Sequence, residues 1–308
     1  MGEGEQKKIL VALDGSERSK LTIEYLTKIK PFEDMGVVLF NVFNGVPESY
    51  WDLEREPKSV KSVKYVRAWE VQQLKDTQEF MDKARQALVR SGFPNEKIDI
   101  KIQHRKKGVA RDILQQAHHG YEAVVSRRRG MGRLPGLILG SVSMKLLENL
   151  SFTPLILAGR KQPGRRYMIA MDGSEGAMKA TEFAGSFLAG NDVEFFLLHV
   201  IRGGEKSGSI LSTPDIFVDD SRKTIAKAFL EAKNRLVAKG FDPDKVTSQI
   251  VTGARSRAGA IVDEGKKAHV GTIIMGRKGL SRTPDFSIGR VTQKVVFLAR
   301  ERSIWIIN

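Results

Sequence analysis

Residues 9–17 read ILVALDGSE and residues 167–175 read YMIAMDGSE, so an apolar stretch that ends in Asp-Gly-Ser occurs twice in the chain. A second pair follows in the same order, because residues 129–141 read RGMGRLPGLILGS and residues 278–290 read KGLSRTPDFSIGR. Two patterns repeated in the same order indicate the duplication of a whole domain. The stretch GRKQPGRR at residues 159–166 predicts the join. We therefore expect a first domain over residues 1–160 and a second over residues 161–308.

Short apolar runs alternate with longer segments of helical period in both halves, which is typical of parallel strands joined by crossover helices. The predicted strands of the first half are residues 9–13, 37–43, 98–103, 123–126 and 155–158. Those of the second half are residues 168–171, 193–200, 247–251, 272–275 and 304–307. A polar surface excursion is expected over residues 44–75, before a helix that ends near Leu88, with a shorter counterpart over residues 202–223. The sequence predicts an α/β fold of two tandem doubly wound domains, each built on a five-stranded parallel sheet.

The composition excludes several kinds of site and partner. The 308 residues include no cysteine, which excludes disulfides, thiolate zinc sites, iron–sulfur clusters and cysteine nucleophiles. The net charge is +15, yet only 7% of the residues are aromatic and the basic runs contain none, so specific nucleic-acid binding is not expected. No stretch has the apolar length of a signal peptide or a membrane span, so we expect no membrane insertion and a cytoplasmic location.

Stronger catalytic and metal motifs are missing from the sequence. It contains no GxxxxGK[ST] loop and no GxSxG elbow, and Pro135 stands where a GxGxxG fingerprint needs its third glycine. The five histidines have no metal-ligand spacing. We therefore predict no catalytic residue and no metal site.

Ligands of open parallel sheets bind beyond the carboxyl ends of the strands. In each half the segment after the fourth strand carries glycines and ends in Gly140-Ser141 or Gly289-Arg290, directly before a helical pattern. Backbone N–H groups at such a point can receive phosphate oxygens, and glycine permits the close approach. Ser141 is expected to cap its helix.

The two Asp-Gly-Ser strands, the five strands per half and the spaced glycines resemble the universal stress protein family, here as a tandem pair. The resemblance covers nearly the whole chain. It implies the adenine nucleotide alpha hydrolase-like fold, in which ATP-binding members hold the base and ribose near the first strand and the phosphates in the glycine segment.

The resemblance assigns nucleotide contacts position by position. Base and ribose contacts fall on Ala12, Leu13 and Asp14 in the first half and on Ala170, Met171 and Asp172 in the second. Phosphate contacts fall on Gly130, Gly140, Ser141, Val142 and Ser143 in the first half and on Gly276, Gly279, Gly289, Arg290 and Val291 in the second.

Both halves depart from the family pattern. Arg127 stands at the first glycine position of the first half, where the backbone approaches the nucleotide. In the second half Arg290 replaces the Ser/Thr of the motif and Asp285 adds a negative charge. The second half is favoured, because it keeps all three glycines and Arg290 can donate two hydrogen bonds to phosphate.

Three classes of function stay open. The first is a nucleotide-responsive regulatory stress protein that binds ATP or a related adenine nucleotide in at least one half. The second is a nucleotide-free interaction or scaffold protein, which Arg127 and Arg290 favour. The third is a weak ATPase, for which no Mg²⁺ site with a water-activating base is identified. The halves are expected to pair through the strands at 155–158 and 304–307, and further association into a homo-oligomer stays open.

Overall fold

The structure is a computed structural model that describes residues 7–29, 35–46, 60–128, 139–161, 163–203, 215–280 and 287–308, with the backbone alone at 60–63 and 215–221. Its strands are β1 (Lys8–Ala12), β2 (Gly36–Phe43), β3 (Ile98–His104), β4 (Ala123–Arg127), β5 (Leu155–Ala158), β6 (Arg166–Ala170), β7 (Glu194–Arg202), β8 (Val246–Ala254), β9 (Thr272–Gly276) and β10 (Ser303–Ile307). They form a single sheet in the order β3-β2-β1-β4-β5-β10-β9-β6-β7-β8.

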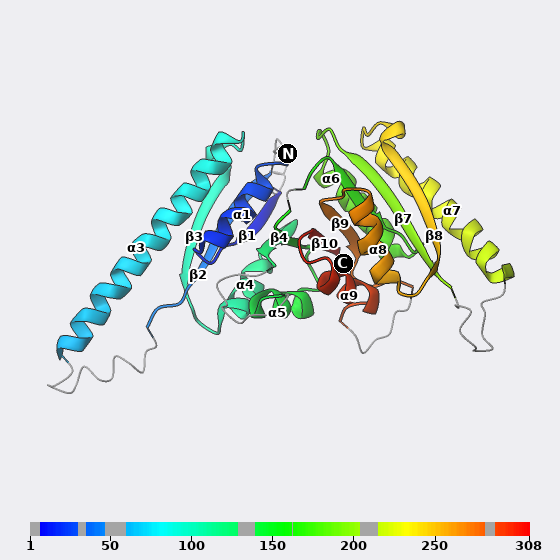
Figure 1. The fold of residues 1–308 in the computed structure, drawn as a ribbon. Helices are drawn as coiled ribbons and strands as arrows, with labels where there is room; N and C mark the ends of the chain where they lie inside the picture. The colour runs from blue at the N-terminus through cyan, green and yellow to red at the C-terminus, as the bar shows by residue number, and fades with distance from the viewer. Residues whose placement is uncertain are drawn as a thin grey trace.

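Each half contributes five parallel strands to that sheet, and the two sets meet at β5 and β10. These two strands pair antiparallel, with Ile156 opposite Trp305, whereas every other strand pair is parallel. Figure 1 shows the halves side by side, with α3 and α7 at opposite outer ends of the molecule. The prediction of two tandem doubly wound α/β units is confirmed, and each predicted strand overlaps an observed one.

The helices cover both faces of the sheet. They are α1 (Glu17–Leu26), α3 (Val60–Arg90), α4 (Val109–Ala117), α5 (Ser141–Asn149), α6 (Glu175–Phe187), α7 (Asp215–Ala238), α8 (Arg257–Lys267) and α9 (Arg290–Leu298), with 3₁₀ turns at Asn95–Lys97 and Pro243–Lys245. One apolar core lies between the sheet and α1, α3, α6 and α7, and the other lies between the sheet and α4, α5, α8 and α9. Strands covered on both faces explain the continuous apolar runs in the sequence.

The predicted surface excursions are shorter than the sequence suggests. Helix α3 begins at Val60 and α7 at Asp215, so the prediction that the first excursion precedes the helix is wrong, although residues 64–75 do lie at the surface. The described side chains in the early turns of α3 are largely exposed, and pairs such as Gln72 with Asp76 one turn later stabilise the helix beyond the stretch that packs on the sheet. Residues 47–59 and 204–214 lie outside the described residues.

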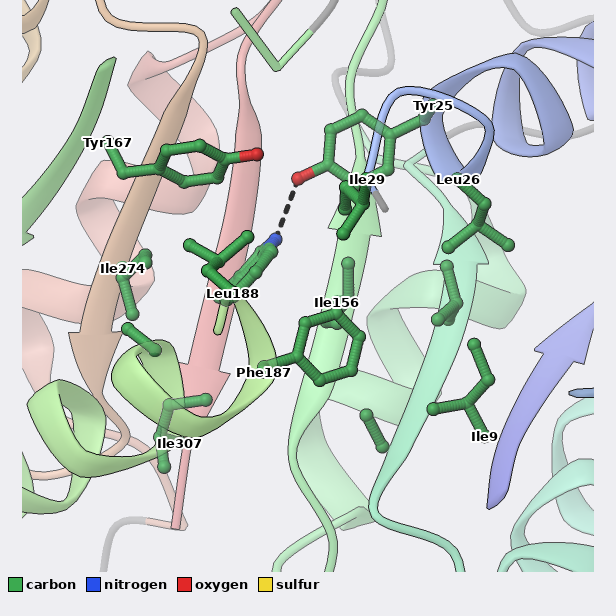
Figure 2. Packing of buried hydrophobic residues seen from close by; sticks show 14 of the residues in the cluster. Ile9, Tyr25, Leu26, Ile29, Ile156, Tyr167, Phe187, Leu188, Ile274 and Ile307 are labelled. Atoms are coloured by element: carbon green, nitrogen blue, oxygen red, sulfur yellow. Dashed lines mark hydrogen bonds between the residues drawn. The ribbon is translucent and has the colours of Figure 1, made fainter. Parts of the chain in front are cut away.

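A buried polar and aromatic cluster joins the two halves (Figure 2). Tyr25 of α1 accepts a 2.8 Å hydrogen bond from Nε1 of Trp305 in β10, and its hydroxyl lies 2.9 Å from Oγ1 of Thr272 in β9. Phe187 of α6 meets the Trp305 ring edge to face, with 5.1 Å between centroids. Burial raises the pKa of Tyr25 to about 12. The first half therefore places one of its own side chains in the core of the second.

Candidate functional site: a cavity at the carboxyl ends of β6, β7 and β9

The Asp-Gly-Ser turn after β6 builds one wall of the site. Gly173 has a φ of 77°, a left-handed conformation that favours glycine. The backbone N–H of Ser174 donates to Oδ1 of Asp172 (3.0 Å), and the Ser174 side chain accepts from the N–H of Ala177, which caps α6. The motif thus ends a strand and starts a helix within three residues.

The glycine segment after β9 packs against this turn. A Cβ on Gly276 would lie 2.6 Å from the carbonyl carbon of Gly176, so strand and helix backbones touch only because both residues are glycine. A Cβ on Gly279 would collide with the Asp172 carboxylate, whose Oδ2 accepts from the N–H of Leu280 (3.2 Å). Asp172 therefore holds both loops, as a turn residue does.

The two loops enclose a cavity of about 500 Å³ at the carboxyl ends of β6, β7 and β9. All the second-half residues that the resemblance assigns to a nucleotide line it: Ala170, Met171, Asp172, Gly276, Gly279, Gly289, Arg290 and Val291. Helix α9 begins at its edge with Gly289 as N-cap, a residue that has no side chain to cap the helix. The first N–H groups of such a helix lack intrahelical acceptors and attract anions.

His199 of β7 also lines the cavity, and the sequence motifs did not predict this position. Its Nδ1 donates to the carbonyl oxygen of Met171 (2.6 Å). Burial lowers the pKa of His199, although this hydrogen bond opposes the shift. At the equivalent position of the first half, Asn41 Nδ2 donates to the Leu13 carbonyl (2.8 Å). The shared spacing from the Asp-Gly-Ser motif is the sequence signal for this position.

The sequence motifs did not predict several basic residues that line the cavity together with Arg290. They are Arg202, Arg255, Arg257, Lys278 and Lys294. Most of them follow the ends of strands or open a helix, which is the signal that the sequence offered.

The corresponding groups of the first half are engaged within the protein. Asp14 Oδ1 accepts from the N–H (3.1 Å) and hydroxyl (2.6 Å) of Ser16 and from the hydroxyl of Ser19. Ser143 donates to the Arg127 carbonyl (2.6 Å). Ser141 is the first residue of α5 and Gly140 is its N-cap, so the prediction that Ser141 caps the helix is wrong.

The other first-half candidates lie near these groups, with one exception. Ala12 and Leu13 are buried at the end of β1, and Val142 is half-buried in α5. Gly130 lies outside the described residues, as do Pro135 and, in the second half, Asp285.

Arg127, at the end of β4, is buried and directed to the segment between the halves. Its Nη1 donates to the carbonyl oxygens of Ala158 (3.3 Å) and Gly159. Burial lowers its pKa, and the nearby charges of Arg160 and Arg18 lower it further. The guanidinium at the first glycine position therefore stabilises the join.

Two further arginines, Arg277 and Arg128, donate hydrogen bonds between the halves. Arg277, next to Gly276, donates to carbonyl oxygens at the end of α5, from Nη2 to Leu147 (2.6 Å) and from Nη1 to Leu150 (2.8 Å). Arg128, its counterpart in the first half, donates from Nη2 to the Val296 carbonyl of α9. Cations suit helix C-termini. Each half thus holds the last helix of the other.

Among the described residues, no group of three or more His, Asp or Glu side chains is arranged to hold a metal ion. No described helix is both long and apolar enough to cross a membrane.

The fold defines a doubly wound α/β protein, with a cavity at the carboxyl ends of its strands, where such folds bind ligands. The model of the universal stress protein family matches residues 5–157 and 164–300, and the chain belongs to this family. Universal stress protein YxiE of Bacillus subtilis strain 168 is 27% identical over 138 residues, which is 42% of this chain and 90% of that protein. A universal stress protein of Mycolicibacterium smegmatis is 24% identical over 62% of this chain and 63% of its own length.

A crystal structure of a universal stress protein from Archaeoglobus fulgidus DSM 4304 has the same fold. It superposes with a TM-score of 0.63 and 19% identity, over 99% of each chain. The tandem arrangement of two family domains is therefore supported by both sequence and structure.

Proposed function

We propose that this universal stress protein is a nucleotide-responsive regulatory protein that binds ATP or a related adenine nucleotide in the cavity of its second half. The observation that carries the proposal is that all the second-half residues assigned from the motifs line one cavity of about 500 Å³. Sites for ligands of this size occupy about 300–1,000 Å³.

The chemistry of the lining fits the parts of a nucleotide. The open N-terminus of α9 offers backbone N–H groups to phosphate oxygens, and Arg290 at its start adds charge-assisted donors. Ala170 and Met171 present an apolar surface to a base at the other end. Because Asp172 is occupied by the N–H groups of Ser174 and Leu280, we assign it to recognition and to shaping the loops, and assign no residue to hydrolysis.

We propose that the two halves act as one intramolecular pair, with the domain boundary at residues 160 and 161. The antiparallel pairing of β5 with β10 and the burial of Tyr25 against Trp305 support this. In this arrangement the first half, with Asp14 and Arg127 engaged internally, is the structural partner of a binding second half.

The experiment first identifies any nucleotide that the purified protein releases when it is denatured. ATP is then titrated by calorimetry into the wild type, Gly279→Asp and Gly130→Asp. Gly279→Asp adds a carboxylate beside that of Asp172 and is expected to abolish binding, whereas Gly130→Asp changes the other half and retains it. Absence of ATP, ADP and AMP binding at millimolar concentration contradicts the proposal and leaves a nucleotide-free interaction protein.

A further inference from the structure

The described lining of the second-half cavity has a large excess of positive charge. Six basic side chains line it: Arg202, Arg255, Arg257, Lys278, Arg290 and Lys294. Asp172 is the one carboxylate among the described lining residues, and both of its oxygens accept backbone N–H groups. Six cations are more than one short phosphate chain needs as partners. Their positions therefore indicate where a second anionic group of a ligand would lie.

The sheet order separates these cations into two groups. Lys278, Arg290 and Lys294 follow β9 or lie in the first turns of α9. Arg202 ends β7, and Arg255 and Arg257 lie between β8 and the first turn of α8. Strand β6 stands between β9 and β7, so the strands nearest the two groups are about 10 Å apart at a spacing of about 4.8 Å per strand.

The group at β7 and α8 lines the cavity, and one of its members, Arg257, is held there by a hydrogen bond. Arg257 Nε donates to the carbonyl oxygen of Val200 (3.3 Å), itself a lining residue. Arg257 also lies close enough to His199 for its charge to lower the pKa of that imidazole. Within the part of the chain that the structure describes, no ion pair involves Arg202 or Arg257.

A nucleotide phosphorylated at one end leaves one of these two groups without an anion. The glycine segment and Arg290 at α9 suit the 5′-phosphates, and Asp172 follows β6, the strand between the two groups. The cations at β7 and α8 then lie on the ribose and base side of the ligand. Arginine forks match phosphate geometry with two parallel hydrogen bonds.

We propose that the cavity takes an adenine nucleotide phosphorylated at both ends, with 5′-phosphate at α9 and a further phosphate, on the 2′ or 3′ oxygen of the ribose, at Arg202 and Arg257. This inference rests on the proposed function, because it names the ligand class of the same site.

The test compares AMP with adenosine 3′,5′-bisphosphate and adenosine 2′,5′-bisphosphate by isothermal calorimetry. The wild type is expected to bind one bisphosphate at least tenfold more tightly than AMP, since one charge-assisted contact suffices for that ratio. The double variant Arg202→Gln and Arg257→Gln is expected to reduce this preference below threefold. Arg300→Gln, an exposed arginine that does not line the cavity, is the matched control and keeps the preference.

Every other result counts against the inference, and the outcomes separate it from the proposed function. If AMP binds as tightly as both bisphosphates, or if the double variant keeps the preference or weakens all three ligands equally, the second phosphate site is overturned while nucleotide binding stands. If no adenine nucleotide binds the wild type, both fall. Thermal denaturation of each variant verifies that the fold is intact.

Discussion

Removing the Tyr25 hydroxyl tests how strongly the two halves depend on each other. Tyr25→Phe keeps the ring, so no apolar cavity forms, but Nε1 of the fully buried Trp305 loses its acceptor. The Oγ1 of Thr272 loses the same partner. A buried donor left without an acceptor costs about 1–3 kcal/mol. We therefore expect the free energy of unfolding to fall by about 1–3 kcal/mol at pH 8, as measured by urea denaturation.

The pH dependence of stability reports the burial of the same hydroxyl. Burial raises the pKa of the folded Tyr25 to about 12, against about 10 in the unfolded chain. The stability that this shift contributes is present below pH 10 and is lost as pH rises from 10 to 12, because the unfolded phenol ionises first. The loss amounts to about 2.7 kcal/mol over the two pH units. Tyr25→Phe has no phenol at this position and does not show this loss, so the difference in the free energy of unfolding between wild type and variant narrows from pH 10 upward.

The matched control is Tyr65→Phe, because Tyr65 on α3 is 76% exposed. It is expected to change the free energy of unfolding by less than about 0.5 kcal/mol. Equal effects of the two substitutions at pH 8, or a constant difference between wild type and Tyr25→Phe from pH 9 to 11.5, would refute the reasoning. The first result would mean that the buried hydrogen bond between the halves contributes nothing to stability, and the second that burial does not raise the pKa of Tyr25.

Two further predictions concern the cavity. Gly276→Ala is expected to lower the melting temperature and to weaken ATP binding in calorimetry, because the added Cβ would lie 2.6 Å from the backbone of Gly176. The control is Gly259→Ala in helix α8, where the added Cβ has its nearest contact at 3.5 Å, and this variant is expected to raise or preserve the melting temperature. Equal melting temperatures for the two would contradict this. Burial lowers the pKa of His199, so its neutral form stabilises the fold above pH 6.5, and this contribution is lost as pH falls. His199→Asn, which copies Asn41 of the first half, is therefore expected to reduce the loss of unfolding free energy between pH 7.5 and 5, as measured by urea denaturation. An unchanged dependence of the unfolding free energy on pH would contradict this.

The sequence predicts the fold well because local and global signals agree. Each apolar run is short, is covered on both faces and is followed by helical period, so strand positions need no information about distant contacts. The long helix α3 is different. Its early turns carry apolar side chains that stay exposed, such as Tyr65, Trp69 and Val71, and the buried face of the helix begins only at Met81, so apolar spacing alone did not mark where the helix starts.

The site is predicted less completely, because its parts come from strands that are distant in the chain. The glycines and Asp172 carry motifs, and these residues line the cavity as a group. Arg202 and Arg257 carry none, since they enter the cavity only through the order β9-β6-β7-β8. The direction of the Arg127 side chain depends on Gly159 beyond the end of β5, which no spacing reveals.

The divergence of the two halves follows from one backbone contact. In the second half Gly176 and Gly276 touch, and this contact sets the glycine segment against the Asp-Gly-Ser turn. At the same positions the first half carries Arg18 and Arg127, whose side chains exclude such a contact. Arg127 instead donates to the join between the halves, where its burial requires the carbonyl acceptors of Ala158 and Gly159. A guanidinium committed there stabilises the pair and is withdrawn from ligand chemistry, which is the physical reason to look for the nucleotide in the second half.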